Sequence, residues 1–457
     1  YDDAQVLIKS FYPRMQTSLL KDDSRLTDED TVIYADTSMC EGVSKKEAHD
    51  RFKKNLYLKL QGDTGKNLPW GYLTGVRPSK IAYSMLEAGN SDEEIMSEFE
   101  EKHFASHDKA ELAMQVAKTE KKILEDIDYT NGYSIYIGIP FCPTTCLYCS
   151  FTSYSLAANR SKVDLYLDAL VKEMRFVADR MKGRRLDTVY FGGGTPTTLE
   201  PEQLDRLLNE LEADFDMSTV KELTVEAGRP DSVTVQKLEV LKKHGVDRIS
   251  INPQTMNDKT LEIIGRRHSA TQVEEAFKLA RSVGFDNINM DIILGLPGEG
   301  INELRYTLDK IKELKPESLT VHSLAIKRAA ALNIWREKYE DLKFENSDET
   351  VSLAQKYAGD IGCMPYYMYR QKNMAGNLEN VGYSVPGKEC IYNILIMEEK
   401  QTIIAMGAGA STKAVFDADQ PGPRIERVEN VKDLTSYISR INEMIERKRI
   451  FFDNNML

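Results

Sequence analysis

Three cysteines of this 457-residue chain lie within eight residues of one another. They are Cys142, Cys146 and Cys149 in the segment CPTTCLYC, which follows the apolar run YSIYIGI at residues 133–139. Thiolates on a short loop after a strand can converge on one inorganic centre, and iron–sulfur clusters are held by such thiolates. The spacing therefore indicates a metal centre bound by these three side chains.

The three other cysteines, Cys40, Cys363 and Cys390, are distant in sequence and have no Cys-x2-Cys partner. A structural zinc site needs four closed ligands. Three thiolates instead leave one corner of a [4Fe–4S] cluster open, and radical chemistry with S-adenosylmethionine (SAM) is a known use of that arrangement. A zinc ion completed by a distant ligand, or three cysteines that bind no metal, are the alternatives.

A glycine-rich segment, FGGGTPT, ends the second predicted strand. Its residues Gly192, Gly193 and Gly194, with Thr195, let backbone groups approach a ligand closely and permit a positive φ. The segment lacks the Lys and Ser/Thr of a Walker A loop. Because a glycine-rich turn between a strand and a helix needs no ligand, these residues alone predict only a close backbone approach.

The elements that must position these residues begin at Tyr133, where apolar strands start to alternate with helical stretches. The strands are YSIYIGI, TVYFGG, ELTVEA, DRISIN, NINMDIIL and SLTVHSL. Such alternation indicates βαβ units and a parallel sheet. Right-handed crossovers would curl six of them into a partial (β/α)6 barrel over residues 131–345, with the chemistry on the loops after the strands. A doubly wound sheet is the alternative within this α/β class.

Two accessory α+β domains are expected to flank the barrel. Residues 1–130 combine short apolar runs read as strands, such as QVLIKSFY at 5–12, with charged helical stretches. Residues 346–457 are expected to hold a strand pair, CIYNILIM and TIIAMGAG, followed by an amphipathic C-terminal helix.

Charge and composition exclude several classes of partner. The net charge of −12 and the pI near 5.3 argue against binding to nucleic acid or to an anionic membrane, because both require a basic face. No window approaches eighteen apolar residues, and the first residues do not resemble a signal peptide. The cysteine pattern is not that of a secreted disulfide framework. A cytoplasmic protein with a small-molecule partner is expected.

The cysteine spacing, with the aromatic Tyr148 before the last cysteine, resembles that of the radical SAM superfamily, where it also follows the first strand. The longer string YIGIPFCPTTCLYC resembles the oxygen-independent coproporphyrinogen III oxidases. WGYLTGVRPSK (70–80) and YRQKNMAGNLENVGYSVPGKECIYNIL (369–395) resemble the HemZ branch of that family. The resemblance covers essentially the whole chain and implies a [4Fe–4S] cluster and SAM as cofactors.

The resemblance also assigns residues to the cofactors. It places Tyr136 beside SAM or the cluster as a candidate catalytic residue, and the GGGT segment at the methionyl amine of SAM. Further SAM ligands implied on successive strand ends are Glu226, Gln254, Arg266 and Asp291. Each has an ordinary structural alternative, such as a helix cap or a surface arginine, and Tyr136 could simply pack inside the barrel. Gly228 and Arg229 precede Pro230, where the family has its proline earlier.

The resemblance implies oxygen-independent oxidative decarboxylation of coproporphyrinogen III, with a tetrapyrrole substrate and a low-potential electron donor of the flavodoxin or ferredoxin type. Arg370, Lys372 and Asn373, beside Tyr366, Tyr367 and Tyr369, would suit propionate groups on a flat ring, although a solvated loop is the alternative. His268 and His322 are expected to be structural, and Gly407–Ser411 to approach the site or form a tight turn.

Two departures from the oxidases bear on the reaction. Gly138 stands where those enzymes carry a histidine, and Phe151 where they carry a fourth cysteine. Slow decarboxylation or another tetrapyrrole is therefore expected. A haem-binding or haem-delivery protein, and a radical methyltransferase or haem-opening enzyme, are the rival functions.

Overall fold

The computed structural model describes residues 2–12, 15, 17–18, 33, 42–74, 77–149, 152–324, 346–370, 378–417 and 423–455. Its largest element is an eleven-stranded sheet with the strand order β13-β12-β11-β1-β4-β5-β6-β7-β8-β10-β9. The six central strands are parallel and coincide with the six predicted from the sequence. They are β1 (Tyr133–Ile139), β4 (Leu186–Gly193), β5 (Glu222–Glu226), β6 (Arg248–Ser250), β7 (Ile288–Leu294) and β8 (Ser318–Ser323).

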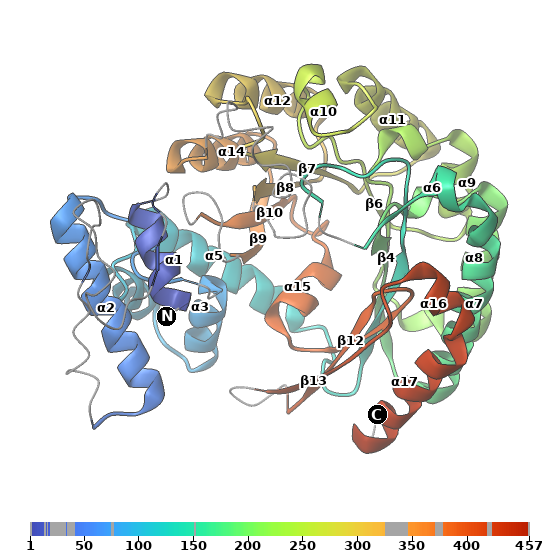
Figure 1. The fold of residues 1–457 in the computed structure, drawn as a ribbon, viewed down its shortest axis with the longest axis horizontal. Helices are drawn as coiled ribbons and strands as arrows, with labels where there is room; N and C mark the ends of the chain where they lie inside the picture. The colour runs from blue at the N-terminus through green and yellow to red at the C-terminus, as the bar shows by residue number, and fades with distance from the viewer. Residues whose placement is uncertain are drawn as a thin grey trace.

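The central strands read as apolar runs because both of their faces are covered. Helices cover the outer face of the curved sheet, as Figure 1 shows, and each turns an apolar stripe toward it. In α8, for example, Leu204, Leu207, Leu208 and Leu211 are buried. The helices are α7 (Val163–Arg180), α8 (Pro201–Asp214), α9 (Val235–Lys243), α11 (Ala270–Val283), α12 (Ile301–Leu314) and α14 (Asp348–Asp360). In the short helix α10 (Asp258–Ile263), Leu261 instead belongs to a small apolar cluster with Leu147 of the cysteine loop.

Strands from the last part of the chain extend the sheet at both ends. On one side β11 (Thr402–Met406) runs parallel to β1, followed by antiparallel β12 (Ser411–Phe416) and β13 (Arg424–Glu429). On the other side β10 (Asn380–Ser384) and β9 (Met364–Tyr369) continue antiparallel from β8. Residues 346–457 therefore share one sheet with the predicted barrel strands, and the proposed domain boundaries stay predictions.

One strand predicted in this region is wrong. The apolar run CIYNILIM forms helix α15 (Ile391–Glu398), which lies inside the curve of the sheet in Figure 1. The Glu222 carboxylate accepts hydrogen bonds from the backbone N–H groups of Ile391 (2.6 Å) and Tyr392 (3.4 Å) and so satisfies the start of this helix. A short apolar run does not distinguish a buried helix from a buried strand. The second predicted strand is confirmed as β11.

The described N-terminal region is helical, so the strand predicted at residues 5–12 is also wrong. Leu7 and Phe11, four residues apart, share the buried face of α1 (Asp2–Phe11). The one β-type pairing among the described residues before β1 is an isolated bridge between Trp70 and Ala105. The helices are α1, α2 (Lys45–Thr64), α3 (Pro78–Glu87), α4 (Asp92–Ser97), a π-helical turn at Glu98–Lys102 and α5 (His107–Leu124).

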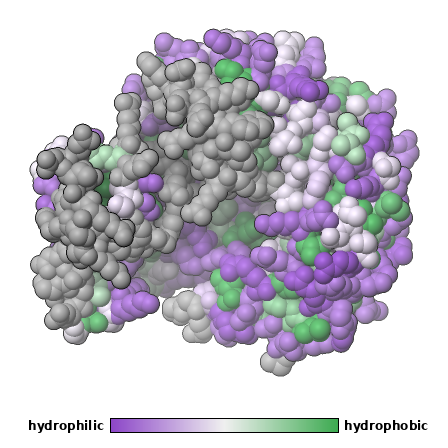
Figure 2. All heavy atoms as spheres, in the orientation of Figure 1, coloured by the Kyte–Doolittle hydropathy of each residue, from purple (hydrophilic) through white to green (hydrophobic). Residues whose placement is uncertain are grey.

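The chain ends with two helices, α16 (Leu434–Ser439) and α17 (Ile441–Asn455), which pack on α7 and confirm the predicted C-terminal helix. The described surface in Figure 2 is largely hydrophilic, and hydrophobic residues form only small separate areas on it. Among the described residues, no helix combines the length and apolarity required to cross a bilayer.

Candidate functional site

The three predicted metal ligands line one cavity of about 390 Å³ at the carboxyl ends of the central strands. Cys142 lies in the short strand β2 (Phe141–Cys142), which pairs with β3 (Tyr154–Ser155) beyond the loop and so ties the two ends of the loop together. Cys142 and Cys149 are partly exposed, Cys146 is buried, and all three are free thiols.

The other described cysteines lie elsewhere, as expected for a three-ligand site. Cys363 donates to the carbonyl of Glu317 at 3.5 Å, and Cys390 donates to the Glu222 carboxylate at 3.3 Å. Cys40 lies outside the described residues. Within the described part of the chain, no three His, Cys, Asp or Glu side chains converge as the ligands of a single metal ion would.

A buried guanidinium lies against the cysteine loop. Arg229, 3% exposed, donates to Thr144 Oγ1 at 3.0 Å and to Cys146 Sγ at 3.8 Å. It forms a two-point ion pair with Asp231 at 2.9 and 2.8 Å. Burial raises the pKa of Cys142 to about 11, and the Arg229 charge acts in the opposite direction. The sequence showed Arg229 only as a departure from the family pattern, so its position beside the thiols was missed.

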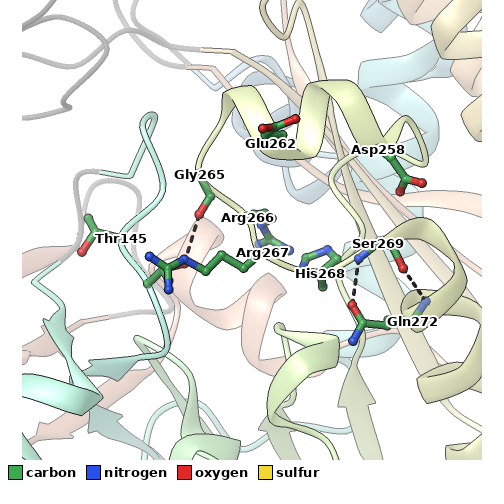
Figure 3. A pocket seen from close by; sticks show the side chains of 10 residues that line it. Thr145, Asp258, Glu262, Gly265, Arg266, Arg267, His268, Ser269 and Gln272 are labelled. Atoms are coloured by element: carbon green, nitrogen blue, oxygen red, sulfur yellow. Dashed lines mark hydrogen bonds between the residues drawn. The ribbon is translucent and has the colours of Figure 1, made fainter.

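The loop between α10 and α11 packs on the outside of the cysteine loop (Figure 3). The N–H of Leu147 donates to Ile264 O, and Thr144 Oγ1 donates to Gly265 O, both at 3.0 Å. Gly265 has φ +78°, and a Cβ there would lie 3.3 Å from Thr145 O, so glycine permits this close approach.

The same loop holds Arg266 and His268, which both lie in the pocket wall drawn in Figure 3. Arg266 is buried and donates to Asn252 O at 2.5 Å, and its charge lies close to Tyr148 and Cys146. Burial, together with the charges of Arg266 and Arg229, lowers the pKa of His268 to about 3. Both ring nitrogens of His268 are buried without a hydrogen-bond partner among the described residues, so its predicted structural role stays a prediction.

The glycine-rich turn lies directly beside the cysteine loop. The N–H groups of Gly194 and Thr195 donate to the carbonyls of Ile139 (2.8 Å) and Phe141 (2.7 Å). Gly193 has φ +108°, and a Cβ on Gly194 would lie 2.5 Å from Phe141 O. The glycines therefore permit close packing of two backbone segments, and the predicted approach of a ligand to this turn stays a prediction. Gly193, Gly194 and Thr195 line the cavity, whereas Gly192 packs beneath it against Tyr190 and Tyr136.

Tyr136 is partly buried on β1, and its hydroxyl lies 3.4 Å from the position that a Cβ of Gly193 would occupy. Its ring stacks at 6.3 Å on Tyr190 and at 6.2 Å on Tyr392. The ring therefore packs inside the barrel, and Tyr136 is not among the residues that line the cavity, so its predicted place beside SAM or the cluster stays a prediction.

The three predicted strand-end ligands, Glu226, Gln254 and Asp291, line the same cavity as the thiols. Glu226 accepts a 2.6 Å hydrogen bond from the hydroxyl of Tyr190. Burial, with the nearby Asp291 charge, raises the pKa of Glu226 to about 7 although the Tyr190 hydrogen bond opposes this shift. Gln254 has φ +66°, which is uncommon for a residue with a side chain, and its Oε1 is buried without a partner.

Asp291 is surrounded by hydrogen-bond donors. Asn289 Nδ2 donates to it at 2.7 Å, and His322 Nε2 lies 3.8 Å away. Burial acts to raise the pKa of Asp291, but His322 and the hydrogen bonds outweigh it, so the pKa lies below its ordinary value. His322 also contacts the Tyr369 hydroxyl at 3.2 Å and lines the cavity. The sequence prediction that His322 is only structural did not anticipate this position.

The predicted polar and aromatic run around residue 370 divides between two places. Tyr367 and Tyr369 line the cavity, but Arg370 is buried, donates to Leu73 O at 2.8 Å and lies over the ring of Trp70 at 5.3 Å. The expectation that Arg370 faces the substrate is wrong, because this side chain joins β9 to the N-terminal region. Lys372 and Asn373 lie outside the described residues.

Gly407 packs against the end of β1, next to Gly138, the position where the oxidases are expected to carry a histidine. A Cβ on Gly407 would lie 2.6 Å from Gly138 O and from the Tyr166 hydroxyl, and one on Gly138 would lie 3.3 Å from Met406 O. The turn after β11 therefore packs on the end of β1, and none of residues 407–411 lines the cavity, so its predicted approach to the site stays a prediction. Phe151, the second departure, is outside the described residues.

Comparison with known proteins gives consistent matches. A family model described as the radical SAM superfamily matches residues 136–311. The chain is 42% identical over 414 residues to the oxygen-independent coproporphyrinogen-III oxidase-like protein HemZ of Bacillus subtilis (strain 168), which covers 89% of this chain and 82% of that protein. It is 39% identical over 194 residues to the heme chaperone HemW of the same organism, covering 42% of this chain and 50% of HemW.

Among solved structures, coproporphyrinogen III oxidase (HemN) from Escherichia coli, described as a radical SAM enzyme, is similar with a TM-score of 0.54. The match has 22% sequence identity and covers 71% of this chain and 73% of that one. At this level of identity the likeness concerns the fold alone.

Proposed function

The chain belongs to the radical SAM superfamily and, within it, to the oxygen-independent coproporphyrinogen-III oxidase-like proteins, and on this premise we propose that it is an enzyme acting on a tetrapyrrole. The radical SAM fold expected from the sequence is confirmed. The observation that carries the proposal is the shared cavity, which brings together three free thiols, the glycine turn and three strand-end polar side chains.

In this proposal Cys142, Cys146 and Cys149 hold a [4Fe–4S] cluster, and the glycine turn, Glu226, Gln254, Arg266 and Asp291 hold SAM. When bound, the two cofactors supply a carbon-centred radical that abstracts hydrogen from the substrate. The residues fit that pair: Arg229 and Arg266 place buried positive charge beside the anionic thiolates, and Gln254 presents an unpartnered oxygen.

The protein's own contribution is positioning and the exclusion of water. Asp291 stays ionised because of its surrounding donors, so it can accept hydrogen bonds from a ligand's hydroxyl groups. Glu226 is held in place by Tyr190, and the backbone at Gly193 and Gly194 leaves room for a ligand where a side chain would stand.

The proposed reaction is the conversion of a propionate side chain to a vinyl group. The propionate side chain loses one hydrogen atom to the radical, and then CO2 and one electron. An electron donor of the flavodoxin or ferredoxin class would start the reaction by reducing the cluster. A separate acceptor would take up the electron that the substrate loses. The names of the HemZ and HemN relatives support this choice of substrate class.

Haem delivery is the second candidate function. The identity to the heme chaperone HemW, over a segment that includes less than half of this chain, supports it. Both functions use a tetrapyrrole, so they differ in turnover rather than in ligand class.

Anaerobic reconstitution with iron and sulfide, followed by incubation with SAM, a reductant and coproporphyrinogen III, tests the proposal. We expect 5′-deoxyadenosine and vinyl products to accumulate together in multiple turnovers. A stable haem complex with a Soret band, without SAM turnover on any tetrapyrrole offered, would contradict the enzyme and establish the carrier.

A further inference from the structure

An arginine with two unpartnered guanidinium nitrogens lies at the floor of the cavity. Arg248, on β6, is 2% exposed and lines the cavity. Its Nε and Nη2 atoms are buried and have no hydrogen-bond partner among the described residues. Ser250 lies two residues further on the same face of β6, also lines the cavity, and its Oγ is likewise without a partner.

The acidic side chains near Arg248 make their hydrogen bonds to other groups. The Glu222 charge stabilises the Arg248 cation, but the oxygens of Glu222 accept from Cys390 Sγ and from the N–H groups of Ile391 and Tyr392. Glu226 accepts from the Tyr190 hydroxyl. No described carboxylate therefore forms an ion pair with Arg248.

A buried cation without a partner is costly, because a charge removed from water must be compensated by hydrogen bonds or an opposite charge. A guanidinium beside a hydroxyl offers several donors in one place, and a carboxylate is the group that such donors bind best. We infer that Arg248, assisted by Ser250, binds a carboxylate of the substrate, which is a propionate of the tetrapyrrole if the proposed function holds.

The position of Arg248 separates this carboxylate from that of SAM. Arg248 lies in register with Thr224 and, beyond it, Tyr190, one layer below Glu226 and Ser250. Arg266, near Cys146, donates to the backbone of Asn252, four residues along the extended chain from Arg248. The backbone positions of residues 248 and 252 are at most roughly 13 Å apart at 3.3 Å per residue, and Arg266 approaches from the far end of that segment. A methionyl group at the cluster end therefore meets Arg266, and a substrate arm that enters the barrel meets Arg248.

The test compares Arg248→Gln and Arg248→Lys with the wild type on anaerobically reconstituted protein. The probes are coproporphyrin III, its tetramethyl ester and SAM, with porphyrin binding followed by absorbance and SAM binding by calorimetry. Arg281→Gln is the matched control. Arg281 lies on α11, is not among the residues that line the cavity, and forms an ion pair with Glu317 at 2.6 Å.

We expect Arg248→Gln to weaken coproporphyrin III binding at least tenfold, Arg248→Lys to weaken it less, and both to keep wild-type iron content and SAM affinity. The ester should bind wild type and Arg248→Gln equally. Unchanged coproporphyrin binding in Arg248→Gln overturns the inference, and so does a loss of SAM affinity with porphyrin binding intact, which would assign the carboxylate to SAM.

The same experiment separates this inference from the proposed function. A wild-type protein that binds no tetrapyrrole contradicts both, whereas wild-type binding that Arg248→Gln leaves unchanged contradicts only the role of Arg248. If Arg248→Gln fails to fold, Ser250→Ala replaces it, with a smaller expected loss of two- to fivefold in coproporphyrin affinity and none for its ester. Equal affinity of Ser250→Ala and wild type for coproporphyrin then overturns the inference.

Discussion

Two groups of buried polar side chains in this molecule differ in whether their hydrogen bonds are complete. One surrounds Glu173 on α7, which accepts from Gly407 N (3.0 Å), Asn430 Nδ2 (2.8 Å), the Tyr437 hydroxyl (2.5 Å) and Lys448 Nζ (2.5 Å). These donors come from the turn after β11, the end of β13, α16 and α17. The Glu173 cluster therefore fastens the C-terminal segment to the sheet and its helices.

The other group lines the cavity, and several of its members have unused polar atoms. Arg248, Ser250, Gln254 and Arg266 each bury at least one nitrogen or oxygen that has no partner among the described residues. Buried polar groups in folded proteins are normally satisfied, because an unsatisfied one costs free energy. The difference indicates that the Glu173 cluster serves the fold, whereas the cavity wall keeps polar atoms that are available to a ligand.

The largest expected effect is on the cavity side. Cys142→Ala, Cys146→Ala and Cys149→Ala should each abolish the [4Fe–4S] absorbance and reduce 5′-deoxyadenosine formation to background, because each thiolate holds one iron. Iron analysis, electron paramagnetic resonance after reduction, and product chromatography measure these losses.

Cys363→Ala and Cys390→Ala are the matched controls, since both thiols are buried away from the loop, and both variants should keep the cluster. Cys40→Ala should keep it as well. Retention of a normal cluster in a single variant of the loop would refute the ligand assignment, and loss of the cluster in a control would reveal a fourth ligand.

The second largest expected effect is on the stability that the Glu173 cluster provides. Lys448→Met leaves the Glu173 carboxylate buried with one partner fewer, and breaking a buried ion pair typically costs about 3–5 kcal/mol. We expect a loss of that size in the free energy of unfolding, measured with denaturant on protein without cofactors. Ser250→Ala should change it by less than about 1 kcal/mol, because Ser250 makes no hydrogen bond that could be lost. Equal losses in the two variants would remove the distinction between the clusters.

The third effect is on cofactor affinity. Asp291→Asn removes a negative charge from the cavity wall, where we propose that it accepts hydrogen bonds from a ligand's hydroxyl groups. Gly193→Val places a branched side chain at φ +108°. Both should weaken SAM binding about tenfold or more, by loss of a charge-assisted hydrogen bond or by obstruction, and leave iron content near normal. Asp286→Asn is the control, because Asp286 is exposed and pairs only with Lys388 at 3.1 Å. Wild-type SAM affinity in both variants would make the two residues purely structural.

The sequence was sufficient for the parallel strands and the cysteine loop, because both are local patterns. A strand buried on both faces is a continuous apolar run, and three cysteines within eight residues need no distant partner to be recognised. The apolar runs at 5–12 and 390–397 were misread as strands, since their helical state depends on what encloses them. For α15 that is Glu222, about 170 residues earlier in the chain.

The sequence also did not predict side chains whose partners lie on other segments. Arg229 contacts Thr144 of the cysteine loop, and His322 lies beside Asp291 of β7. The residues next to Arg229 and His322 in the sequence give no sign of these contacts. Arg248 did carry a usable signal: an arginine inside a buried strand is uncommon, and such a residue needs either an acidic partner or a ligand.

The smallest effect concerns the protonation of Glu226. Its folded-state pKa of about 7 lies above the ordinary 4.5, so the folded protein keeps this proton as the pH rises through that window, while the unfolded chain loses it. The contribution of Glu226 to stability is therefore full below about pH 4.5 and is lost as the pH approaches and passes 7. Glu226→Gln cannot ionise and should be more stable than wild type by about 3 kcal/mol at pH 8, with little difference near pH 4.5.

Tyr190→Phe sharpens this prediction, because the Tyr190 hydrogen bond lowers the pKa of Glu226 and its removal should extend the window to higher pH. Denaturant unfolding of cofactor-free protein at several pH values measures both variants. Parallel pH profiles for wild type and Glu226→Gln would mean that this carboxylate is already ionised below pH 5. The cavity would then hold a satisfied carboxylate like Glu173, and the contrast between the two clusters would rest on Arg248 and its unpartnered neighbours alone.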